Sequence, residues 1–353
     1  MSTVSDFAAL ESSIAPYLLR PDRTPKHQPG TYQPPYPSFS ARFDERVGAV
    51  VMAYLGVQAR DPADPALSRS LDDLRRRLAG EHAPDYWDRA SYVDAAGFTN
   101  VISIAYWTDK AEFSAWFAAD GESWACAERA GDGLGYFAEL VWPTIERFET
   151  IFSANDRVEG VAGASQSMSG MIEEHAYWGS MRDRLPLAQT APLYSSGAPK
   201  LVAEGPVRTV VLPQNACLIR SGQDLTDCGE VERDAYLGEV EPSLRAGMDF
   251  LRDAGRAIGC FDNRYLTVLD DNDQPTQRTF GMSWWRDLAA LEDWAASHPT
   301  HVKIFGVAMR HLSSFGPDTR LRLYHEVSVP SAVEQRFVYV GCHDATGMLR
   351  AAL

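Results

Sequence analysis

Two histidines of this chain lie in patterns where an imidazole could bind a metal or transfer a proton. His325 lies in residues 320–329, where apolar and polar residues alternate, which predicts a β-strand with His325 on its apolar face. His301 ends the string Ser-His-Pro-Thr-His (297–301) and precedes apolar residues at helical spacing, so we expect it in the first turn of a helix. A neutral imidazole beside an apolar cleft is suited to bind haem iron. The alternatives are a buried core histidine for His325 and a capping or surface histidine for His301.

A serine ends the apolar face of a second expected strand. Cys217, Ile219 and Ser221 share one face of the segment 216–221. A nucleophile elbow of the form Gly-x-Ser-x-Gly is absent there, so Ser221 is better suited to orient a substrate than to attack it. The alternative is an ordinary serine at a strand end.

Two arginines follow an aromatic segment in Glu174-His-Ala-Tyr-Trp-Gly-Ser-Met-Arg-Asp-Arg184. Arg182 and Arg184 could face an anionic group, such as a haem propionate or a polar substrate. The alternative is that they form surface ion pairs with Asp183 and Glu174.

The overall composition excludes several classes of function. The chain has 353 residues and a formal net charge of −15, with an isoelectric point near 5.0, so nucleic-acid binding is not expected. Because no signal peptide and no membrane-length apolar run is present, we expect a soluble cytoplasmic protein. Its five cysteines form no Cys-x-x-Cys pair. This spacing disfavours a zinc ribbon and a covalently attached c-type haem, and favours reduced thiols.

The elements that must position these residues follow a proline-rich segment, residues 15–40, which we expect as part of an extended N-terminal arm (1–40) on the body or on a partner subunit. A loop is expected at 132–137 and a long connection at 156–205. Hydrophobic periodicity predicts strands at 47–58, 98–107, 146–152, 208–212, 216–221, 264–269, 278–285 and 320–329. It predicts helices at 65–79, 110–119, 242–254, 288–296 and 301–312.

A weak internal repeat suggests how these elements are arranged. The string YWTDKAEFSAWF (106–117) resembles WWRDLAALEDWA (284–295), and RFETIF (147–152) falls near the position that matches LYHEVS (323–328). The pattern predicts an α+β fold with two ferredoxin-like pseudo-repeats, at about 41–155 and 206–353, joined by the long connection. We expect them to form one domain (41–353), a central sheet or barrel core flanked by helices, with a haem in a cleft between the halves. No P-loop, dinucleotide fingerprint or Ser-His-Asp order is present.

The same segments resemble the aldoxime dehydratase family, also called phenylacetaldoxime or alkylaldoxime dehydratases. The resemblance runs from about residue 30 to the end. It is carried by the strings YQPPYP, VVMAYLGVQ, GDGLGYF, ERFETIF, EEHAYWGSMRDR, LIRSGQD, GMDFLRD, SHPTH, LRLYHEVSV and CHDATGMLR.

The resemblance implies a haem b that is bound without covalent attachment, in a homodimer that acts on a small aldoxime. It implies His301 as the axial ligand of the haem iron and His325 as the histidine on the substrate side. It further implies Ser221, Glu149 and a pocket arginine, Arg184 with Arg182 as the second choice, as residues linked to activity.

The expected reaction is loss of water from R–CH=N–OH to give a nitrile, catalysed by a lyase. The oxime nitrogen would bind ferrous haem, Ser221 would hold the hydroxyl, and protonated His325 would release it as water and then take the proton from the aldoxime carbon. Arg184 and Glu149 would adjust the proton affinity of His325. The rival functions are a haem peroxidase-like or chlorite-decomposing enzyme on a similar scaffold, a non-catalytic haem sensor, and a cofactor-free α+β protein.

Overall fold

The computed structural model describes residues 10–156 and 159–353. The α-helices in this part are α1 (Pro65–Leu78), α2 (Lys110–Trp116), α3 (Ser180–Arg184), α4 (Glu230–Ala235), α5 (Glu241–Ala254), α6 (Leu288–Ser297), α7 (Pro299–Phe315) and α8 (Leu349–Ala352). The strands are β1 (Ala41–Arg42), β2 (Val51–Ala59), β3 (Tyr86–Val93), β4 (Thr99–Trp107), β5 (Gly135–Val141), β6 (Phe148–Phe152), β7 (Ser167–Met168), β8 (Lys200–Glu204), β9 (Val207–Val211), β10 (Cys217–Asp224), β11 (Cys260–Leu269), β12 (Pro275–Trp285), β13 (Arg322–Ser328) and β14 (Gln335–Val340). This is a mixed α+β fold, as expected.

Within the described residues, twelve strands form one sheet in the order β6-β13-β10-β12-β11-β3-β4-β2-β5-β14-β9-β8. Neighbouring strands run antiparallel throughout. The chain order β2-α1-β3-β4-α2-β5 in the first half gives the spatial order β3-β4-β2-β5. The second half gives the matching spatial order, β11-β12-β10-β13, and β11 pairs with β3 to join the halves.

Local sequence explains why the helices start where they do and which face they bury. In α1 the Asp64 carboxylate accepts a hydrogen bond from Ala66 N, and Pro65 occupies the first turn, where its missing N–H costs nothing. Leucines spaced three or four residues apart then form the buried face: Leu67, Leu71, Leu74 and Leu78. Helices α2 and α6 begin in the same way, at the aspartate caps Asp109 and Asp287.

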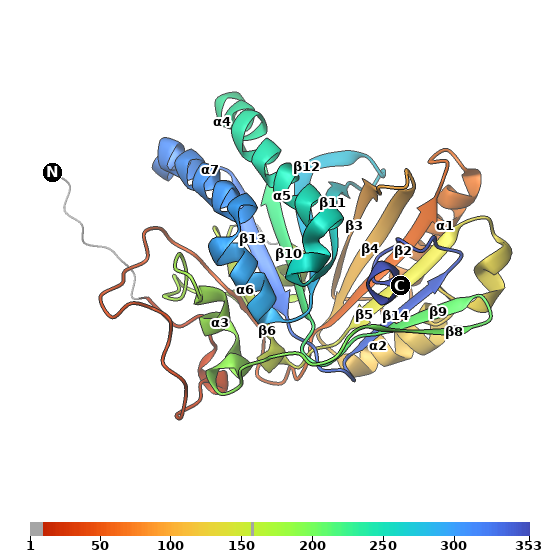
Figure 1. Cartoon of the computed structure of the whole chain (residues 1–353), viewed down its shortest axis with the longest axis horizontal. Coiled ribbons are helices and arrows are strands. Elements are labelled where there is room, and N and C mark those ends of the chain that lie inside the picture. The colour runs from red at the N-terminus through yellow and green to blue at the C-terminus, as the bar shows by residue number, and fades with distance from the viewer. Residues whose placement is uncertain (1–9, 157–158) are drawn as a thin grey trace.

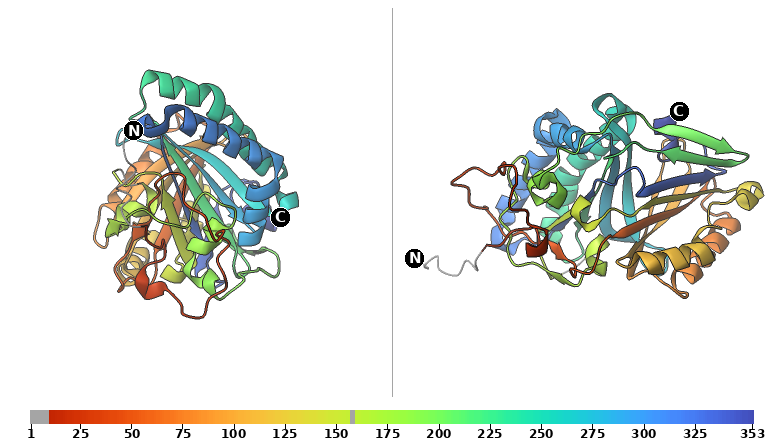
Figure 2. Two further views of the ribbon diagram at one scale, coloured as in Figure 1. Left: turned by 90° about the vertical axis from the view of Figure 1, so that its left-hand side faces the viewer. Right: turned by 90° about the horizontal axis from the view of Figure 1, so that it is seen from below.

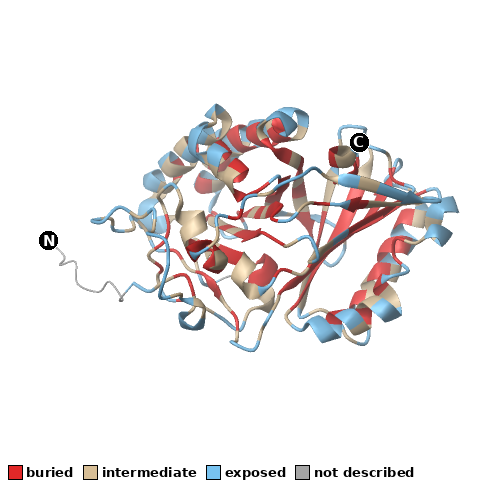
Figure 3. Cartoon of the chain, turned by 60° about the horizontal axis from the view of Figure 1, so that its bottom comes forward, coloured by how far each residue is buried: buried red, intermediate tan, exposed pale blue. Residues whose placement is uncertain are grey.

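The helices cover the outer faces of the two halves of the sheet. Helices α1 and α2 lie against the first half, and α5 and α6 lie against the second half (Figures 1 and 2). The inner faces pack on each other in a core cluster that includes Tyr54 and Tyr106 from the first half with Phe280 and Trp284 from the second. Figure 3 shows buried strands inside exposed helix surfaces. The expected haem cleft between the two halves is not confirmed: side chains of this cluster fill the space between the inner faces.

Several local expectations were also wrong. Strands β3, β5, β8 and β14 and the short strands β1 and β7 were not expected; β5 begins inside the predicted loop 132–137, at Gly135, and β8 lies inside the expected connection 156–205. The segment RFETIF does not match LYHEVS in the other half of the molecule. It contains β6, which pairs directly with β13 at the edge of the sheet, and β5 occupies the matching place.

The proline-rich segment runs along the body with little regular structure. One 3-10 turn, Pro16–Leu18, is its longest regular piece among the described residues. Thr24 N donates to Gln189 O at 2.8 Å, and Glu11 bridges to Ile172, so the segment is tied to the connection between the halves. In Figure 1 it is the red-to-brown chain beside α3. We call residues 10–40 the arm; residues 1–9 of the expected arm lie outside the described residues.

No helix in the described part of the chain is both long and apolar enough to cross a membrane.

Candidate functional site

Three neighbouring strands bring two of the predicted residues side by side. In the pairing of β10 with β13, Ser221 lies directly opposite His325. In the pairing of β13 with β6, His325 lies opposite Ile151. Because residues opposite each other on paired strands point to the same face of a sheet, Ser221, His325 and Ile151 form one row. The row lies on the sheet face that α5 and α6 cover. The helices contact residues next to the row on the same strands, such as Cys217 and Val327.

Burial along these strands shows that this face is incompletely filled. On β10 only Ile219 and Ser221 fall short of full burial among the described residues, and on β13 Leu323 and His325 do so together with Arg322 at the strand end. The alternate residues on the opposite face, such as Arg220, Tyr324 and Glu326, are buried. The partly exposed row therefore leaves an apolar surface with one imidazole and one hydroxyl available to a ligand.

An ion-paired cluster lies next to this row. Arg184 from α3 donates through Nε to Glu149 Oε2 at 2.6 Å and through Nη2 to Oε1 at 3.3 Å. His325 Nε2 lies 3.0 Å from Glu149 Oε1 and 2.8 Å from Arg184 Nη2. Glu149 and Arg184 are buried, whereas the His325 side chain is 22% exposed.

The position of His325 Nε2 between these two groups suits a proton-transfer residue. Arg184 can only donate a hydrogen bond, and ionised Glu149 can only accept one. When Nε2 carries no proton it accepts from Arg184, and when it is protonated it donates to Glu149. The same geometry therefore serves both protonation states of His325.

The charge on Glu149 is maintained by its partners. Burial alone would raise the pKa of Glu149, but Arg184 and His325 outweigh it and hold the pKa below its usual range. The carboxylate is therefore ionised at neutral pH, and the arginine compensates its charge in a place that water hardly reaches.

Further contacts fix the orientation of Arg184. Its Nη1 donates to the backbone oxygen of Glu174 at 2.8 Å and to Ser180 Oγ at 3.2 Å. Arg182 points elsewhere, because it binds Glu292 at 2.6 Å and Pro192 O at 2.9 Å. Of the two arginines considered from the sequence, Arg184 is the one in contact with His325.

The two histidines of Ser-His-Pro-Thr-His have different roles in α7. His298 is the N-cap: its Nδ1 faces Thr300 N at 3.4 Å and Thr300 Oγ1 at 2.9 Å, and its ring stacks on Phe250. His301 lies in the first turn, and its Nδ1–H donates to Ala295 O at 2.7 Å. Burial lowers the pKa of His301. A neutral ring whose Nδ1 is used as a donor has a free lone pair on Nε2, which is the arrangement of a metal-ligating histidine.

Apolar side chains around His301 are poorly covered. Trp178 and Phe305 are 51% and 40% exposed, and their rings lie 5.3 Å apart, with His301 6.2 Å from Trp178. Helix α7 packs closely on α5: a Cβ on Gly247 would lie 2.5 Å from Ile304 Cδ1. An incompletely buried apolar surface beside a neutral imidazole fits a flat apolar cofactor such as haem.

A family model for haem-containing dehydratases matches residues 53–348 of this chain. The chain belongs to the haem-containing dehydratase family.

Proteins named as aldoxime dehydratases are similar to this chain over nearly its whole length. An aliphatic aldoxime dehydratase of Pseudomonas chlororaphis is 41% identical, with 98% of this chain and 99% of that protein covered. A phenylacetaldoxime dehydratase of Bacillus sp. (strain OxB-1) is 30% identical, with 92% and 94% covered. A crystal structure of an aldoxime dehydratase in complex with butyraldoxime superposes with a TM-score of 0.93 at 39% identity, covering 98% of this chain and 97% of that one.

Haem is accordingly the cofactor of this family member. The neutral imidazole of His301 and the partly exposed apolar side chains around it fit a haem. Among the predicted residues, Ser221, His325 and Glu149 lie on the neighbouring strands β10, β13 and β6 at one end of the sheet, and Arg184 reaches Glu149 and His325 from α3. His301 lies on α7, with its own contacts to Ala295 and Trp294 (ring centroids 4.6 Å apart).

Sequence reasoning missed a second charged cluster, on the buried face of the same strands. Arg220 binds Asp88 at 2.7 Å and Tyr106 Oη at 2.8 Å, and Tyr106 Oη donates to Glu326 Oε1 at 2.6 Å. Arg220 lies opposite Glu326 in the register, beside the pair Ser221 and His325. The alternation along 320–329 carried the signal, because it places Tyr324 and Glu326 together on the face opposite His325.

Proposed function

We propose that this protein is a lyase that converts aldoximes to nitriles and water, with His325 as the group that moves the proton. The observation that carries the proposal is the position of His325 Nε2 between Arg184 Nη2 and Glu149 Oε1, with Ser221 beside His325 in the register. The relatives named as aldoxime dehydratases supply the reaction class.

His301 is the residue that would hold the haem iron, through Nε2, because its Nδ1 is used by Ala295 O. When bound, ferrous haem b supplies an electron-rich iron to which an oxime nitrogen can bind, and no net oxidation or reduction occurs.

The residues of the chain then account for the proton movements. Ser221 hydrogen-bonds the oxime hydroxyl and holds it towards His325. Protonated His325 gives its proton to that hydroxyl as the N–O bond breaks, so water leaves. The neutral imidazole next takes the proton from the aldoxime carbon, and the C≡N bond of the nitrile forms. Glu149 and Arg184 stabilise His325 in its charged and neutral states in turn.

Aliphatic aldoximes are the substrate class we propose first. The relatives with about 40% identity are named aliphatic aldoxime dehydratases, whereas the relative named for phenylacetaldoxime is 30% identical. Butyraldoxime is the ligand in the similar crystal structure, and it is the natural first test compound.

The wider architecture belongs to the same proposal. We infer two ferredoxin-like halves, at about 41–155 and 206–353, within one haem-binding domain (41–353), preceded by the arm. The matching strand orders of the two halves support this. We place the haem between α7 and the row of Ser221 and His325, which the partly exposed residues on that face support. A homodimer in the cytoplasm completes the proposal, and five unpaired cysteines support a reducing compartment.

An absorption spectrum of the purified protein, before and after dithionite, followed by anaerobic addition of butyraldoxime, tests the proposal. We expect a Soret band that shifts on reduction and again with the aldoxime, and nitrile formed by the ferrous sample alone. A haem spectrum without nitrile would reject the dehydratase in favour of a haem sensor. Turnover of peroxide or chlorite by the ferric form, without nitrile, would favour the peroxidase-like rival.

A further inference from the structure

We propose that Glu174 is a positioning residue through which the arm sets Arg184 against His325. The inference deepens the proposed function and rests on it in one respect, namely that His325 moves the proton. Glu174 is buried, and its backbone oxygen accepts a hydrogen bond from Arg184 Nη1 at 2.8 Å. Its carboxylate, in contrast, is bound by donors of the arm. One residue therefore joins the arm to the guanidinium that contacts His325.

The helix that carries Arg184 cannot hold its position alone. Helix α3 has five residues, and it begins at Gly179 without a side-chain cap. Helices this short are not stable unless other parts of the protein hold them. The chain before α3 adds little support of its own, because residues 173–179 form turns and bends rather than helix or strand. The position of Arg184 is consequently set by contacts from outside α3.

The nitrogens of the Arg184 guanidinium have two kinds of partner. Nε and Nη2 contact Glu149 and His325, the pair that transfers the proton in the proposed reaction. Nη1 points to Ser180 Oγ and to Glu174 O. Because Ser180 belongs to α3, it would move together with Arg184. Among the described residues, Glu174 is therefore the partner that can fix Nη1 from outside the helix.

Three donors from the arm bind the Glu174 carboxylate. Lys26 Nζ lies 2.6 Å from Oε1, Ser12 Oγ donates to the same oxygen at 3.0 Å, and the Ser13 N–H donates to Oε2 at 2.8 Å. Burial alone would raise the pKa of Glu174, but these donors outweigh it and hold the pKa below its usual range. The carboxylate is therefore ionised, and charge-assisted hydrogen bonds at both of its oxygens keep it in one place.

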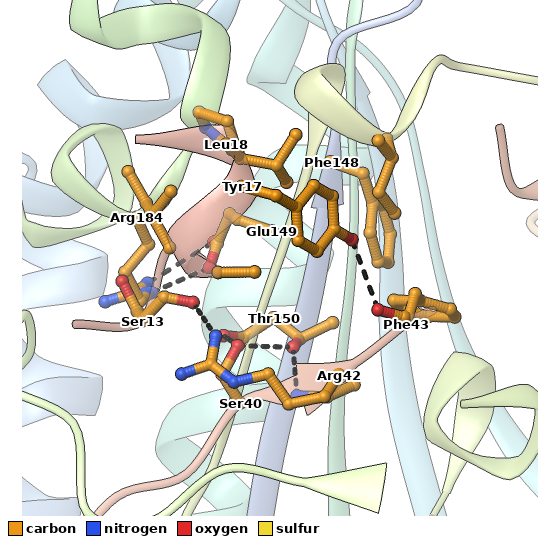
Figure 4. A pocket seen from close by; sticks show the side chains of 15 residues that line it. Ser13, Tyr17, Leu18, Ser40, Arg42, Phe43, Phe148, Glu149, Thr150 and Arg184 are labelled. Atoms are coloured by element: carbon orange, nitrogen blue, oxygen red, sulfur yellow. Dashed lines mark hydrogen bonds and ion pairs between the residues drawn. The ribbon is translucent and has the colours of Figure 1, made fainter. Parts of the chain in front are cut away.

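The arm also holds the residue next to Arg184. Asp183 Oδ2 accepts from the His27 N–H at 2.8 Å, and Asp183 Oδ1 lies 2.8 Å from His27 Nδ1. Figure 4 shows a further approach of the arm, where Ser13 lines a cavity together with Arg184. The arm thus contacts the segment around Arg184 at several points. Its attachment to Glu174 is the one that continues through a hydrogen bond to the guanidinium itself.

Loss of the Glu174 charge should loosen Arg184 without removing any group that contacts His325. Glu174→Gln keeps the shape of the side chain, but an amide accepts hydrogen bonds at one end only, and Lys26 loses its buried anion. The backbone of residue 174 can then shift, and Arg184 Nη1 with it. Because proton transfer depends on exact placement, we expect kcat for butyraldoxime to fall by about 10- to 100-fold. KM should change little, since no group that binds the substrate is lost.

Two measurements on the haem-loaded protein test the proposal. Nitrile formation by the ferrous enzyme gives kcat and KM per bound haem. Hydrogen exchange of the Arg184 Nε–H, followed by NMR in the ferrous carbon monoxide complex, reports how firmly the guanidinium is held. Comparison with Arg184→Lys assigns its signal. We expect Glu174→Gln to accelerate this exchange on the order of tenfold. A role in stability alone would lower the yield of haem-loaded protein and leave both measurements unchanged.

Glu173→Gln is the matched control for Glu174→Gln. Glu173 binds the same Lys26 Nζ at 3.3 Å, but its side chain is 38% exposed. Its backbone oxygen accepts from the N–H of His175 rather than from Arg184. The control therefore removes a carboxylate from the same lysine and leaves the contact with Arg184 intact. We expect its kcat and its exchange rate to stay close to those of the unchanged protein.

A second set of variants approaches the same contact from the arm, and it decides the question if Glu174→Gln does not fold. Lys26→Met removes the cation that binds Glu174, whereas Lys26→Arg keeps a cation there. Arg20→Met is the control, since Arg20 anchors the arm to Glu146 at 2.8 Å. Lys26→Met should reproduce the effects of Glu174→Gln, with Lys26→Arg and Arg20→Met close to the unchanged protein. Combining Lys26→Met with Glu174→Gln should give no further loss of kcat.

Exchange of the Arg184 Nε–H at its original rate in folded Glu174→Gln would overturn the proposal. Equal effects of Glu173→Gln and Glu174→Gln would also overturn it, because the charge near Lys26 would then matter rather than the contact with Arg184. Equal effects of Lys26→Met and Lys26→Arg would show that the arm does not act through this ion pair. If the unchanged protein formed no nitrile while Glu174→Gln still accelerated exchange, the proposed function would fail and the positioning of Arg184 by the arm would stand.

Discussion

His325 Nε2 lies 3.0 Å from Glu149 Oε1, although the two residues are 176 positions apart in the chain. They meet because β6 adds to the edge of the sheet beside β13, so that a strand just before the long connection delivers a carboxylate to a strand near the C-terminus. Arg184 then neutralises that carboxylate at 2.6 Å. The proton-transfer residue and its charge partner thus belong to different segments that only the complete sheet brings together.

Replacing His325 tests its role as acid and base. His325→Gln removes the titratable group, and we expect kcat to fall by about 10²- to 10⁴-fold, the usual contribution of general acid–base catalysis. Haem content should not change, because His301 is the proposed ligand. The measurement is nitrile formation by the ferrous enzyme, with haem quantified in the same preparation. Activity within a factor of a few of the original would remove His325 from the mechanism.

Glu149 should make the protein sensitive to acid. Its pKa is lower in the folded protein than the ordinary value of 4.5, so the folded state gains stability above about pH 4.5, and loses it as the pH falls through the folded pKa. Glu149→Gln leaves Arg184 buried without its anion, and we expect a loss of about 3 kcal/mol in the free energy of unfolding at pH 7.

Urea unfolding between pH 3 and pH 7 checks this prediction. The stability of Glu149→Gln should change less than that of the unchanged protein over the acid range. Glu81→Gln is the control, because the Glu81 side chain is 90% exposed and its loss should cost less than about 0.5 kcal/mol. Parallel pH curves for Glu149→Gln and the unchanged protein would count against an ionised Glu149.

His301 and His298 form a matched pair for testing haem ligation. His301→Ala should abolish haem retention, because its Nε2 is the proposed donor to iron. His298→Ala should keep the haem and lower stability by about 1 kcal/mol through loss of the helix cap. The ratio of Soret to protein absorbance after gel filtration measures haem retention in both variants. Denaturant unfolding measures the stability of His298→Ala. Retained haem in His301→Ala with loss in His298→Ala would reverse the assignment.

The sequence predicted the strands in which apolar residues alternate or form a continuous run, and the helices in which apolar residues recur every three or four positions. Strands β2, β4, β10, β12 and β13, and helices α1, α5, α6 and α7, lie within a few residues of their expected bounds. Strand β3 was missed because Asp88 and Arg89 interrupt its apolar pattern. Their charges are compensated by Arg220 and Asp273, which are distant in the sequence.

The sequence also left open which face of the sheet the cofactor site would occupy. Alternation along β13 separates Leu323, His325 and Val327 from Tyr324 and Glu326, but it does not say which set faces the other half of the molecule. In the structure Tyr324 and Glu326 face the core, and charge pairing makes that burial tolerable. The residues of the site were predicted from motifs, whereas their contacts depend on the strand β6 at the sheet edge.

The buried cluster behind the site should be important for stability. Arg220→Met removes the cation that contacts Asp88 and Tyr106, and leaves a buried carboxylate unpaired. We expect the free energy of unfolding to fall by about 3–5 kcal/mol. Arg245→Met is the control: Arg245 pairs with Glu241 on the surface of α5 with its side chain 54% exposed, so its loss should cost less than about 0.5 kcal/mol. Denaturant unfolding measures the stability of both variants. If Arg220→Met were as stable as Arg245→Met, the buried cluster would contribute nothing to stability.

Glu159 should give the stability a second pH dependence, of opposite sign to that of Glu149. Burial raises the pKa of Glu159 to about 7, although Arg278 at 3.2 Å opposes the rise. Between the ordinary glutamate value of 4.5 and pH 7, the unfolded chain has lost this proton while the folded protein keeps it, so stability decreases as the pH rises through this range. Glu159→Gln is neutral at every pH and should remove a decrease on the order of 3 kcal/mol. The free energy of unfolding of the unchanged protein and of Glu159→Gln is measured at pH 5 and at pH 8. If stability falls between these two pH values by the same amount in both proteins, Glu159 titrates in its ordinary range.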